Sequence, residues 1–156
     1  MTVGLTGLFV PGTGPAGPAG PIGPIGPASP SFISWGANSV SSTTTNRYLY
    51  PWYDDSLASI AGNLIDYICP VNCTIDKMYV SHNTPGGNGN NIIYTVRKNG
   101  VATALTVTIP STSLSGSDLV DSIIIAAGDL LDIEVTKPLS IGSSPMNIVV
   151  TCRITP

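Results

Sequence analysis

Charged residues are scarce in this chain. Lys, Arg, Asp and Glu together make up 10% of its 156 residues, against about a quarter in an ordinary soluble domain. With six Lys and Arg and a formal net charge of -3, the chain has no basic stripe that could displace counterions from phosphate. We therefore expect no nucleic-acid partner.

Long apolar runs are also missing. No run approaches the ~20 residues that a membrane-spanning helix requires. The first residues carry none of the basic charge of a secretory signal, and the longest apolar run there, residues 8–10, is too short for its hydrophobic core. We expect no membrane insertion, no export by the general secretory route, and synthesis and assembly in a cytoplasm.

Residues for catalysis or metal binding are few. The single histidine, His82, lies beside a Gly/Asn-rich segment, and no Gly-x-Ser-x-Gly elbow accompanies it. Asp54 and Asp55 lack the spaced oxygen ligands that calcium needs. Cys69, Cys73 and Cys152 have no fourth partner for zinc. We expect no enzyme activity, no metal and no cofactor.

The chain has three cysteines, which is an odd number. In a reducing cytoplasm they are expected to be buried thiols, and Cys152 lies within an alternating apolar series that fits this interpretation. A bridge from Cys152 to Cys69 or to Cys73 that forms later in an oxidising exterior is the alternative. The Asn72-Cys73-Thr74 sequon is expected to occur by chance, because no secretory signal precedes it.

A glycine repeat is the most informative feature that is present. Five Gly-Pro-X triplets follow one another without a break, with glycine at Gly14, Gly17, Gly20, Gly23 and Gly26. Only glycine fits at the crowded axis of a collagen triple helix, so the repeat predicts a rod of roughly 45 Å and a homotrimer. A flexible Pro/Gly linker is the alternative. Such a short repeat would not trimerise alone, so the C-terminal part must help to hold three copies together.

The repeat divides the chain into three parts. Residues 1–11 are expected to be a hydrophobic anchor that docks into a larger assembly, with the apolar residues Val3, Leu5, Leu8, Phe9 and Val10. A disordered tail is the alternative. Residues 12–30 form the predicted collagen-like stalk, and residues 31–156 are long enough for one globular head with its own core.

Strand and turn signals fill the head. Residues 92–97 and 105–109 alternate in polarity around Asn99-Gly100, which predicts a hairpin with a type I′ turn. Residues 119–126 and 131–136 flank the turn Ala127-Gly128-Asp129, and residues 148–154 form a last alternating strand. Weaker strands are expected at residues 32–35, 47–53, 64–68 and 75–80. Eight to ten short strands and no helical periodicity predict an all-β sandwich.

Two groups of head residues are candidate contact sites. The aromatic cluster Tyr48, Tyr50, Trp52 and Tyr53 predicts a core or trimer contact, and sugar stacking is the alternative. Residues 83–91 are rich in Gly and Asn and predict an exposed loop at one end of the sandwich. Its candidate receptor residues are Asn83, Asn88, Asn90 and Asn91.

A family resemblance follows from residues 94–102, 105–107 and 127–131. The run Tyr-Thr-Val-Arg-Lys-Asn-Gly-Val-Ala, then Leu-Thr-Val, then Ala-Gly-Asp-Leu-Leu, resembles the trimeric jelly rolls of the tumour necrosis factor and complement-head superfamily. It is similar above all to those behind collagen-like stalks in phage fibre and spike proteins and in bacterial spore-surface filaments. The resemblance implies a ten-strand sandwich, trimerised about a three-fold axis by aromatic and aliphatic faces, and no catalytic residue.

The order of parts predicts a function. We expect a structural virion surface protein of a bacteriophage or related virus, a trimeric head fibre, decoration or spike protein. Its N-terminus would bind a capsid or tail protein, and its head would face outward to contact a host surface glycan or protein. A filament protein of the spore outer layer and a soluble lectin-like trimer are the alternatives.

Overall fold

The head is built of β-strands. The computed structural model describes residues 17–21, 23, 26, 29–40, 45–52, 58, 66–139 and 144–156. These residues form nine strands and no helix, which confirms the all-β prediction. The strands are β1 (Ser31–Ser39), β2 (Asn46–Pro51), β3 (Tyr67–Ile68), β4 (Cys73–Ser81), β5 (Ile92–Lys98), β6 (Val101–Ile109), β7 (Ser115–Ile125), β8 (Leu130–Thr136) and β9 (Met146–Thr155).

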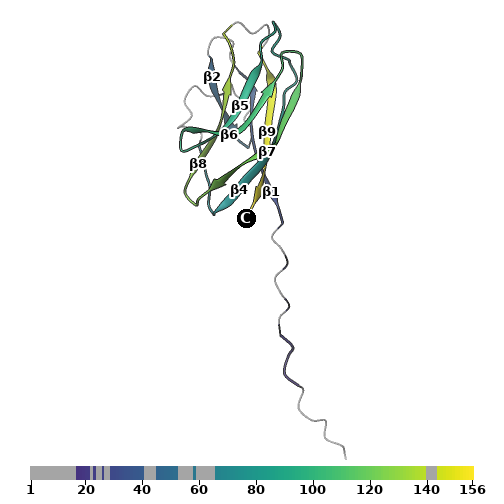
Figure 1. Cartoon of the computed structure of the whole chain (residues 1–156), viewed down its shortest axis with the longest axis vertical. Helices are drawn as coiled ribbons and strands as arrows, with labels where there is room; N and C mark the ends of the chain where they lie inside the picture. The colour runs from purple at the N-terminus through teal and green to yellow at the C-terminus, as the bar shows by residue number, and fades with distance from the viewer. Residues whose placement is uncertain are drawn as a thin grey trace, which may run out of the picture.

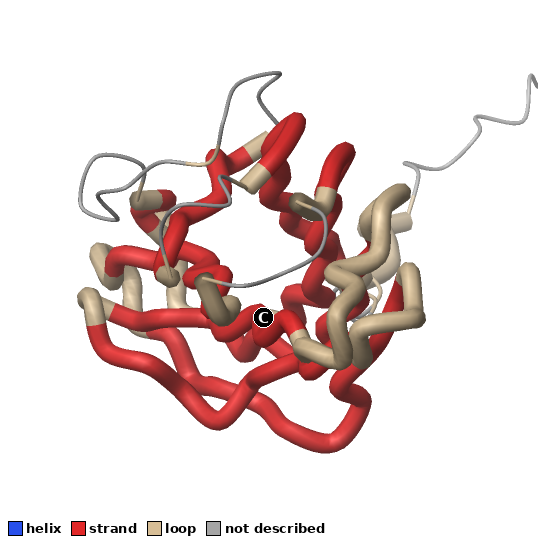
Figure 2. Tube along the Cα trace, turned by 90° about the horizontal axis from the view of Figure 1, so that it is seen from above, coloured by secondary structure: helices blue, strands red, loops and turns tan. Residues whose placement is uncertain are grey.

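The strands pair in one antiparallel path that folds into two layers. Their order is β6-β5-β8-β2-β1-β9-β4-β7, with β3 added to β8. One layer contains β7, β4, β9 and β1, and the other contains β6, β5, β8 and β3 (Figure 1). Strand β2 joins the layers, because residues 46–49 pair with β8 and its last two residues pair with β1. Seen from above, the strands form a nearly closed ring (Figure 2).

The two ends of the path meet at β6 and β7. The backbone of Gly116 on β7 lies so close to β6 that an added Cβ would be 2.8 Å from Val107 Cγ1. The Thr106 amide on β6 donates a hydrogen bond to Asp118 Oδ2 on β7 (3.2 Å). This closure, together with the strand order, is consistent with a jelly-roll-like β-sandwich.

The core lies between the layers and follows the alternation predicted from sequence. Strands β5, β6, β8 and β9 each bury every second residue. These buried residues are Ile92, Tyr94, Val96, Leu105, Val107, Ile109, Leu131, Ile133, Val135, Ile148, Val150 and Cys152. Strands β1 and β4, which lie in the same layer as β9, add Ile33, Trp35, Ile75, Met78 and Val80. Burying one such apolar side chain contributes about 1.5–3 kcal/mol, so this pattern decides which face of each strand turns inward.

The predicted hairpin turn is present. Asn99 and Gly100 have φ values of 51° and 76°, the two positive angles of a type I′ turn. The Asn99 side chain donates to Asp129 Oδ1 (2.8 Å) and accepts from the Leu130 amide (2.9 Å). The β5-β6 turn is therefore joined to the β7-β8 turn, where Gly128 has a φ of 92°.

Some strand boundaries differ from the predictions. Strand β1 continues to Ser39, beyond residue 35, and β7 begins at Ser115, before residue 119. Both added segments are rich in serine and glycine, so apolar alternation gives no signal there, and pairing with β9 and β4 extends the strands. Strand β2 ends at Pro51, and Trp52 follows in a turn with a φ of 68°. Tyr53 and residues 64 and 65 lie outside the described residues.

The strand directions define two ends of the head. Ser31 pairs with Ile154, so the start of β1 and the C-terminus lie at the same end, which we call the stem end (Figure 1). The turns at residues 69–72, 99–100 and 126–129 lie there too. The connections at residues 82–91 and 110–114 lie at the opposite end, which we call the distal end.

Part of the predicted stalk is described. All of its described residues are exposed. Added Cβ atoms at Gly17, Gly20, Gly23 and Gly26 would meet nothing within 4 Å in a single chain. Gly14 and the predicted anchor, residues 1–11, lie outside the described residues. In the part of the chain that the structure describes, no helix could cross a membrane.

Candidate interaction surfaces

The outward face of the β7-β4-β9-β1 layer is arranged in rows across the four strands. The first row, nearest the stem end, contains Phe32, Arg153, Asp76 and Ser122. The second row contains Ser34, Thr151, Tyr79 and Ser117, and the third contains Gly36, Val149, Ser81 and Ser115. We call the second and third rows the serine face. Its side chains are short or aromatic, and none carries a charge at neutral pH.

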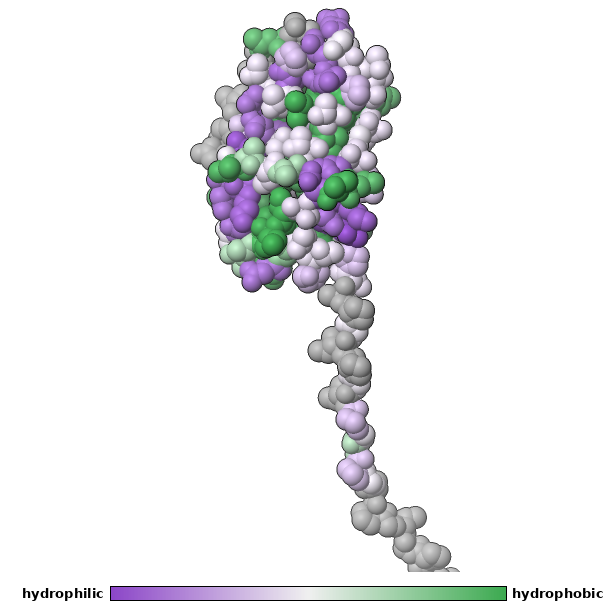
Figure 3. All heavy atoms as spheres, viewed as in Figure 1, coloured by the Kyte–Doolittle hydropathy of each residue, from purple (hydrophilic) through white to green (hydrophobic). Residues whose placement is uncertain are grey.

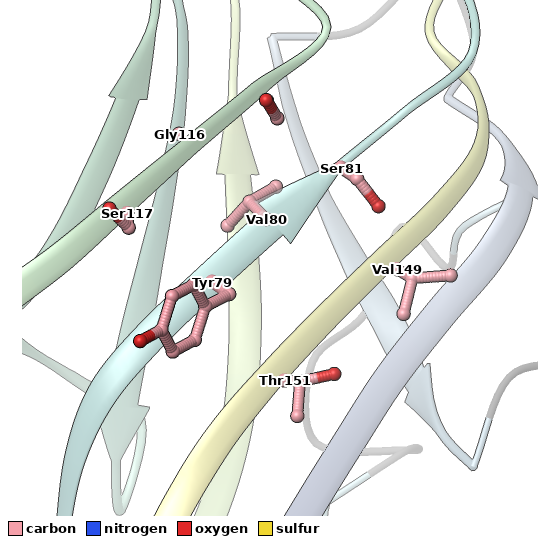
Figure 4. A pocket seen from close by; sticks show the side chains of 8 residues that line it. Tyr79, Val80, Ser81, Gly116, Ser117, Val149 and Thr151 are labelled. Atoms are coloured by element: carbon pink, nitrogen blue, oxygen red, sulfur yellow. The ribbon is translucent and has the colours of Figure 1, made fainter.

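A shallow hollow lies on the serine face. Its volume is about 360 Å³, and Tyr79, Ser81, Gly116, Ser117, Val149 and Thr151 line it. Figure 4 shows Tyr79 and Ser81 on β4 lying across from Thr151 and Val149 on β9. Tyr79 is 50% exposed and Val149 is 37% exposed. An uncharged, partly apolar sheet face with a hollow is suited to contact with another protein surface.

Two irregularities interrupt the neighbouring strands. In β4 the register shifts at Lys77, whose φ is 49°, and the strand bends there as at a β-bulge. Opposite it in β7, residues 119–121 stand against the single residue Lys77. Asp118 Oδ1 accepts hydrogen bonds from the amides of Val120 and Asp121, which fixes this β7 bulge. Leu119 is 53% exposed and Val120 is 91% exposed.

The charged pair of the first row is largely satisfied within the chain. Arg153 Nε donates to Asp76 Oδ1 (2.8 Å), and Arg153 Nη2 donates to Asp76 Oδ2. The guanidinium lowers the pKa of Asp76, and the carboxylate raises the pKa of Arg153. Phe32 on β1 is the neighbour of Arg153 in this row, and it is 64% exposed. Green apolar atoms gather in the lower half of the face seen in Figure 3, among purple polar ones.

The structure separates the aromatic residues that the sequence analysis grouped. Tyr48 is half-buried beneath Arg97, whose Cζ lies 4.4 Å from the ring centroid and whose Nη1 donates to the Tyr48 hydroxyl (3.2 Å). Tyr50 is half-buried opposite Gly36 on β1. Trp52 is 65% exposed and packs edge-on against Tyr67, with 6.1 Å between ring centroids. A trimer contact by these residues, and by Tyr53 outside the described residues, stays a prediction.

Arg97 also makes a buried ion pair. Its Nε and Nη2 each donate to a carboxylate oxygen of Asp132 at 2.8 Å. The alternation of β8 turns Asp132 away from the core, yet Asp132 is buried because Arg97 and the strands around it cover it. Burial, a hydrogen bond to Asp132 and the charge of Asp132 raise the pKa of the neighbouring Asp66. We interpret this cluster as structural, because its donors and acceptors satisfy one another.

The predicted loop forms the distal end. No residue from 83 to 91 is in a strand, as predicted, and Asn83, Asn88 and Asn91 are exposed, while Asn90 is half-exposed. Backbone bonds hold the loop, since Gly87 donates to Ser111 O (3.0 Å) and Asn83 donates to Met146 O (2.9 Å). The loop is therefore a constrained surface and points away from the stem end.

His82 is part of this constraint. It is 4% exposed, with Nε2 at 3.1 Å from Ser113 O and Nδ1 at 2.9 Å from the Tyr94 hydroxyl. Because a carbonyl only accepts, Nε2 carries the proton and Nδ1 accepts from the tyrosine. Burial lowers the pKa of His82. This geometry gives His82 a structural role that joins three segments of the distal end.

Within the described residues, no three His, Cys, Asp or Glu side chains are grouped to hold a metal ion. The serine face could not be predicted from the sequence, because its four serines and its one threonine are spread over four strands. Only the pairing register of the strands brings these residues together. The polar positions within residues 147–153 and 74–81 were a partial sequence signal for an outward face. The close approach of Cys69 and Cys73 (Sγ to Sγ 3.4 Å) was also not predicted from the sequence. The only disulfide expected as an alternative joined Cys152 to one of these two cysteines.

Comparison with known proteins adds no relative to this description. No protein-family model matches the chain, and no curated protein is similar to it in sequence.

Proposed function

We propose that this protein is a trimeric, stalked surface protein of a virion, from a bacteriophage or related virus. In this proposal residues 1–11 bind a capsid or tail protein, residues 12–30 form a short collagen triple helix, and the jelly-roll head faces outward. The observation that carries the proposal is the uninterrupted glycine repeat directly ahead of an all-β head.

The repeat also indicates which face of the head lies at the trimer axis. Three chains of a triple helix run close to one axis, and only three residue steps, at most roughly 10 Å, separate Ala28 from the start of β1. The stem end of β1 must therefore lie near the axis in all three copies. Phe32, exposed at this position, and the serine face that continues from it would turn inward.

The surfaces on this side are suited to a head-to-tail contact. The β7 bulge presents exposed Leu119 and Val120, and the serine face has the hollow between β4 and β9. Two different patches on one chain form a heterologous contact, which generates a closed ring when the rotation permits. The β7 bulge of one copy would thus pack on the serine face of the next, and three copies would close the ring.

Paired threonine variants test this face. Thr151→Arg places a charge in the second row of the serine face, whereas Thr108→Arg places the same charge on exposed β6 in the other layer. Sedimentation velocity of the full chain should show that Thr151→Arg dissociates the trimer and that Thr108→Arg leaves it intact. Equal behaviour of the two variants would contradict the assigned face.

Particle incorporation tests the function. Immunogold labelling with antibody against residues 31–156 should mark the capsid or tail of density-purified virions. A chain without residues 1–11 should still form a folded trimer but should no longer join particles. Labelling of spores would show a spore-filament protein, and trimer found only in culture supernatant would show a soluble one.

The distal loop is the proposed host contact. Residues 83–91 lie opposite the stem end, and so they would project furthest from the particle. Loops on a rigid scaffold tolerate variation, which suits receptor contact. Replacing the exposed Asn83, Asn88 and Asn91 by alanine together should reduce adsorption of virions to host cells. Unchanged adsorption would leave decoration of the particle as the role of the head.

A further inference from the structure

Two buried thiols lie in contact at the stem end. Cys69 and Cys73 are 2% and 5% exposed, and their Sγ atoms are 3.4 Å apart. Cys69 Sγ is also 3.2 Å from Val71 O, to which its thiol can only donate. The Cys73 thiol then donates to Cys69 Sγ, so the two sulfurs face each other directly.

Backbone contacts hold this geometry independently of the sulfurs. The Cys69 amide donates to Asp129 O (2.9 Å), and Cys69 O accepts from the Gly128 amide (2.8 Å). The side chain of Asn72 accepts from the Ala127 amide (2.8 Å). The turn that carries both cysteines is thus fixed to the β7-β8 turn. A bond of about 2 Å between the sulfurs therefore requires only a small movement.

The two cysteines belong to different layers. Cys69 directly follows β3, which pairs with β8. Cys73 begins β4, which pairs with β7 in the other layer. A bond between them would join the layers at the end of the head next to the stalk.

Cys73 has a route to solvent. It lines a hollow of about 420 Å³ together with Thr74, Lys98, Ile124 and Pro156. Ile124 is 80% exposed at this hollow. Cys152 has no such access, because it is completely buried on β9, where its neighbours Arg153 and Thr151 pair with Asp76 and Tyr79.

We propose that Cys69 and Cys73 are a disulfide-forming site, oxidised by a small disulfide such as oxidised glutathione that enters at Cys73. The Cys73 thiolate attacks one glutathione sulfur, forms a mixed disulfide and releases one glutathione thiolate, which takes up the proton that Cys73 lost. Cys69, after losing its proton, attacks Cys73 Sγ and expels the second glutathione thiolate. The products are the Cys69–Cys73 disulfide and two glutathione molecules, and the two electrons pass to glutathione.

The first step is slow at neutral pH. Burial and the hydrogen bond to Cys69 raise the pKa of Cys73 to about 11. Because the thiolate is the nucleophile, the oxidation rate should rise about tenfold per pH unit between pH 7 and pH 9. A cytoplasm keeps glutathione reduced, so the site stays reduced there, and it is oxidised after release into an oxidising exterior.

The test uses the full-length folded protein, reduced and then treated with oxidised glutathione. Trypsin cleaves after Arg47 and Lys77, so Cys69 and Cys73 stay on one peptide, whereas Cys152 lies on another. We expect the peptide of residues 48–77 to lose about 2 Da and the Tm to rise by roughly 5 °C. Three unreacted thiols after prolonged treatment at pH 9, a link to Cys152, or an unchanged Tm would overturn the proposal.

Single substitutions test the order of the steps. Cys69→Ser should retain glutathione on Cys73 as a stable adduct of about 305 Da. Cys152→Ala is the matched control and should form the disulfide as the wild type does. An adduct that accumulates on the wild-type protein would show that Cys69 does not resolve it. The wild-type measurement stands even where a variant fails to fold, and neither result depends on the oligomeric state.

Discussion

Two Arg–Asp pairs in the head provide a comparison of buried and exposed ion pairs. Arg97–Asp132 and Arg153–Asp76 both join neighbouring strands through two hydrogen bonds. Their burial differs, since the side chains of Arg97 and Asp132 are 14% and 2% exposed, whereas those of Arg153 and Asp76 are 30% and 19% exposed. Arg97→Met and Arg153→Met should therefore differ strongly in their effect on stability.

The expected magnitudes follow from what each variant leaves behind. Arg97→Met leaves the Asp132 carboxylate buried without a partner charge and beside Asp66, which costs about 3–5 kcal/mol. It also removes the cation–π contact with Tyr48, worth about 0.5–1 kcal/mol. Arg153→Met leaves Asp76 in reach of water, so its cost should be far smaller. Adding Asp132→Asn to Arg97→Met removes the stranded charge and should recover at least half of the loss.

Urea unfolding at one fixed protein concentration measures these differences. With a slope of about 2 kcal/mol per M, Arg97→Met should lower the midpoint by roughly 2 M, and Arg153→Met should lower it by much less. Equal midpoints for the two single variants would refute the reasoning that burial decides the value of these pairs. Failure of Asp132→Asn to recover stability would refute the assignment of the loss to a stranded carboxylate.

Three further predictions concern His82 and two glycines. His82 has a pKa lowered by burial from 6.5, so the unfolded chain binds its proton more readily, and the Tm should fall as the pH drops below about 6.5; a His82→Gln variant with the same pH dependence would contradict this. Gly116→Ala forces a Cβ against Val107 and should cost about 1–3 kcal/mol in urea unfolding, and a neutral effect would argue against the closure of β6 on β7. Gly20→Ala has free space in a single chain, so it should weaken the triple-helix signal in circular dichroism and leave the melting of the head unchanged; an equal change in head melting would show that stalk and head are not separate units.

The sequence was most informative where one short pattern decides the structure. Asn99-Gly100 predicted the β5-β6 turn, because few other dipeptides adopt two positive φ angles. Alternation predicted the core of β5, β6, β8 and β9, since burial of one face determines the register. By contrast, β1 and β7 were predicted too short because their serines carry no period, and only pairing with other strands reveals them.

The interaction surfaces were harder to predict for the same reason. Tyr79 and Thr151 are neighbours only because β4 and β9 pair in one register, and the shift at Lys77 changes which side chains of β4 face outward. The approach of Cys69 to Cys73 depends on a turn held by Asp129 and Gly128, more than fifty residues away. Tyr48 was assigned by its aromatic character, whereas its surroundings are set by Arg97 on another strand.

The mass of the full chain in solution tests the central claim most directly. Size-exclusion chromatography with light scattering should give about 48 kDa, three times the 16.0 kDa of one chain. The same value should hold across a tenfold dilution, because a head contact and a stalk would support each other. A mass of one or two chains would contradict the trimer, and with it the stalked surface protein that we propose.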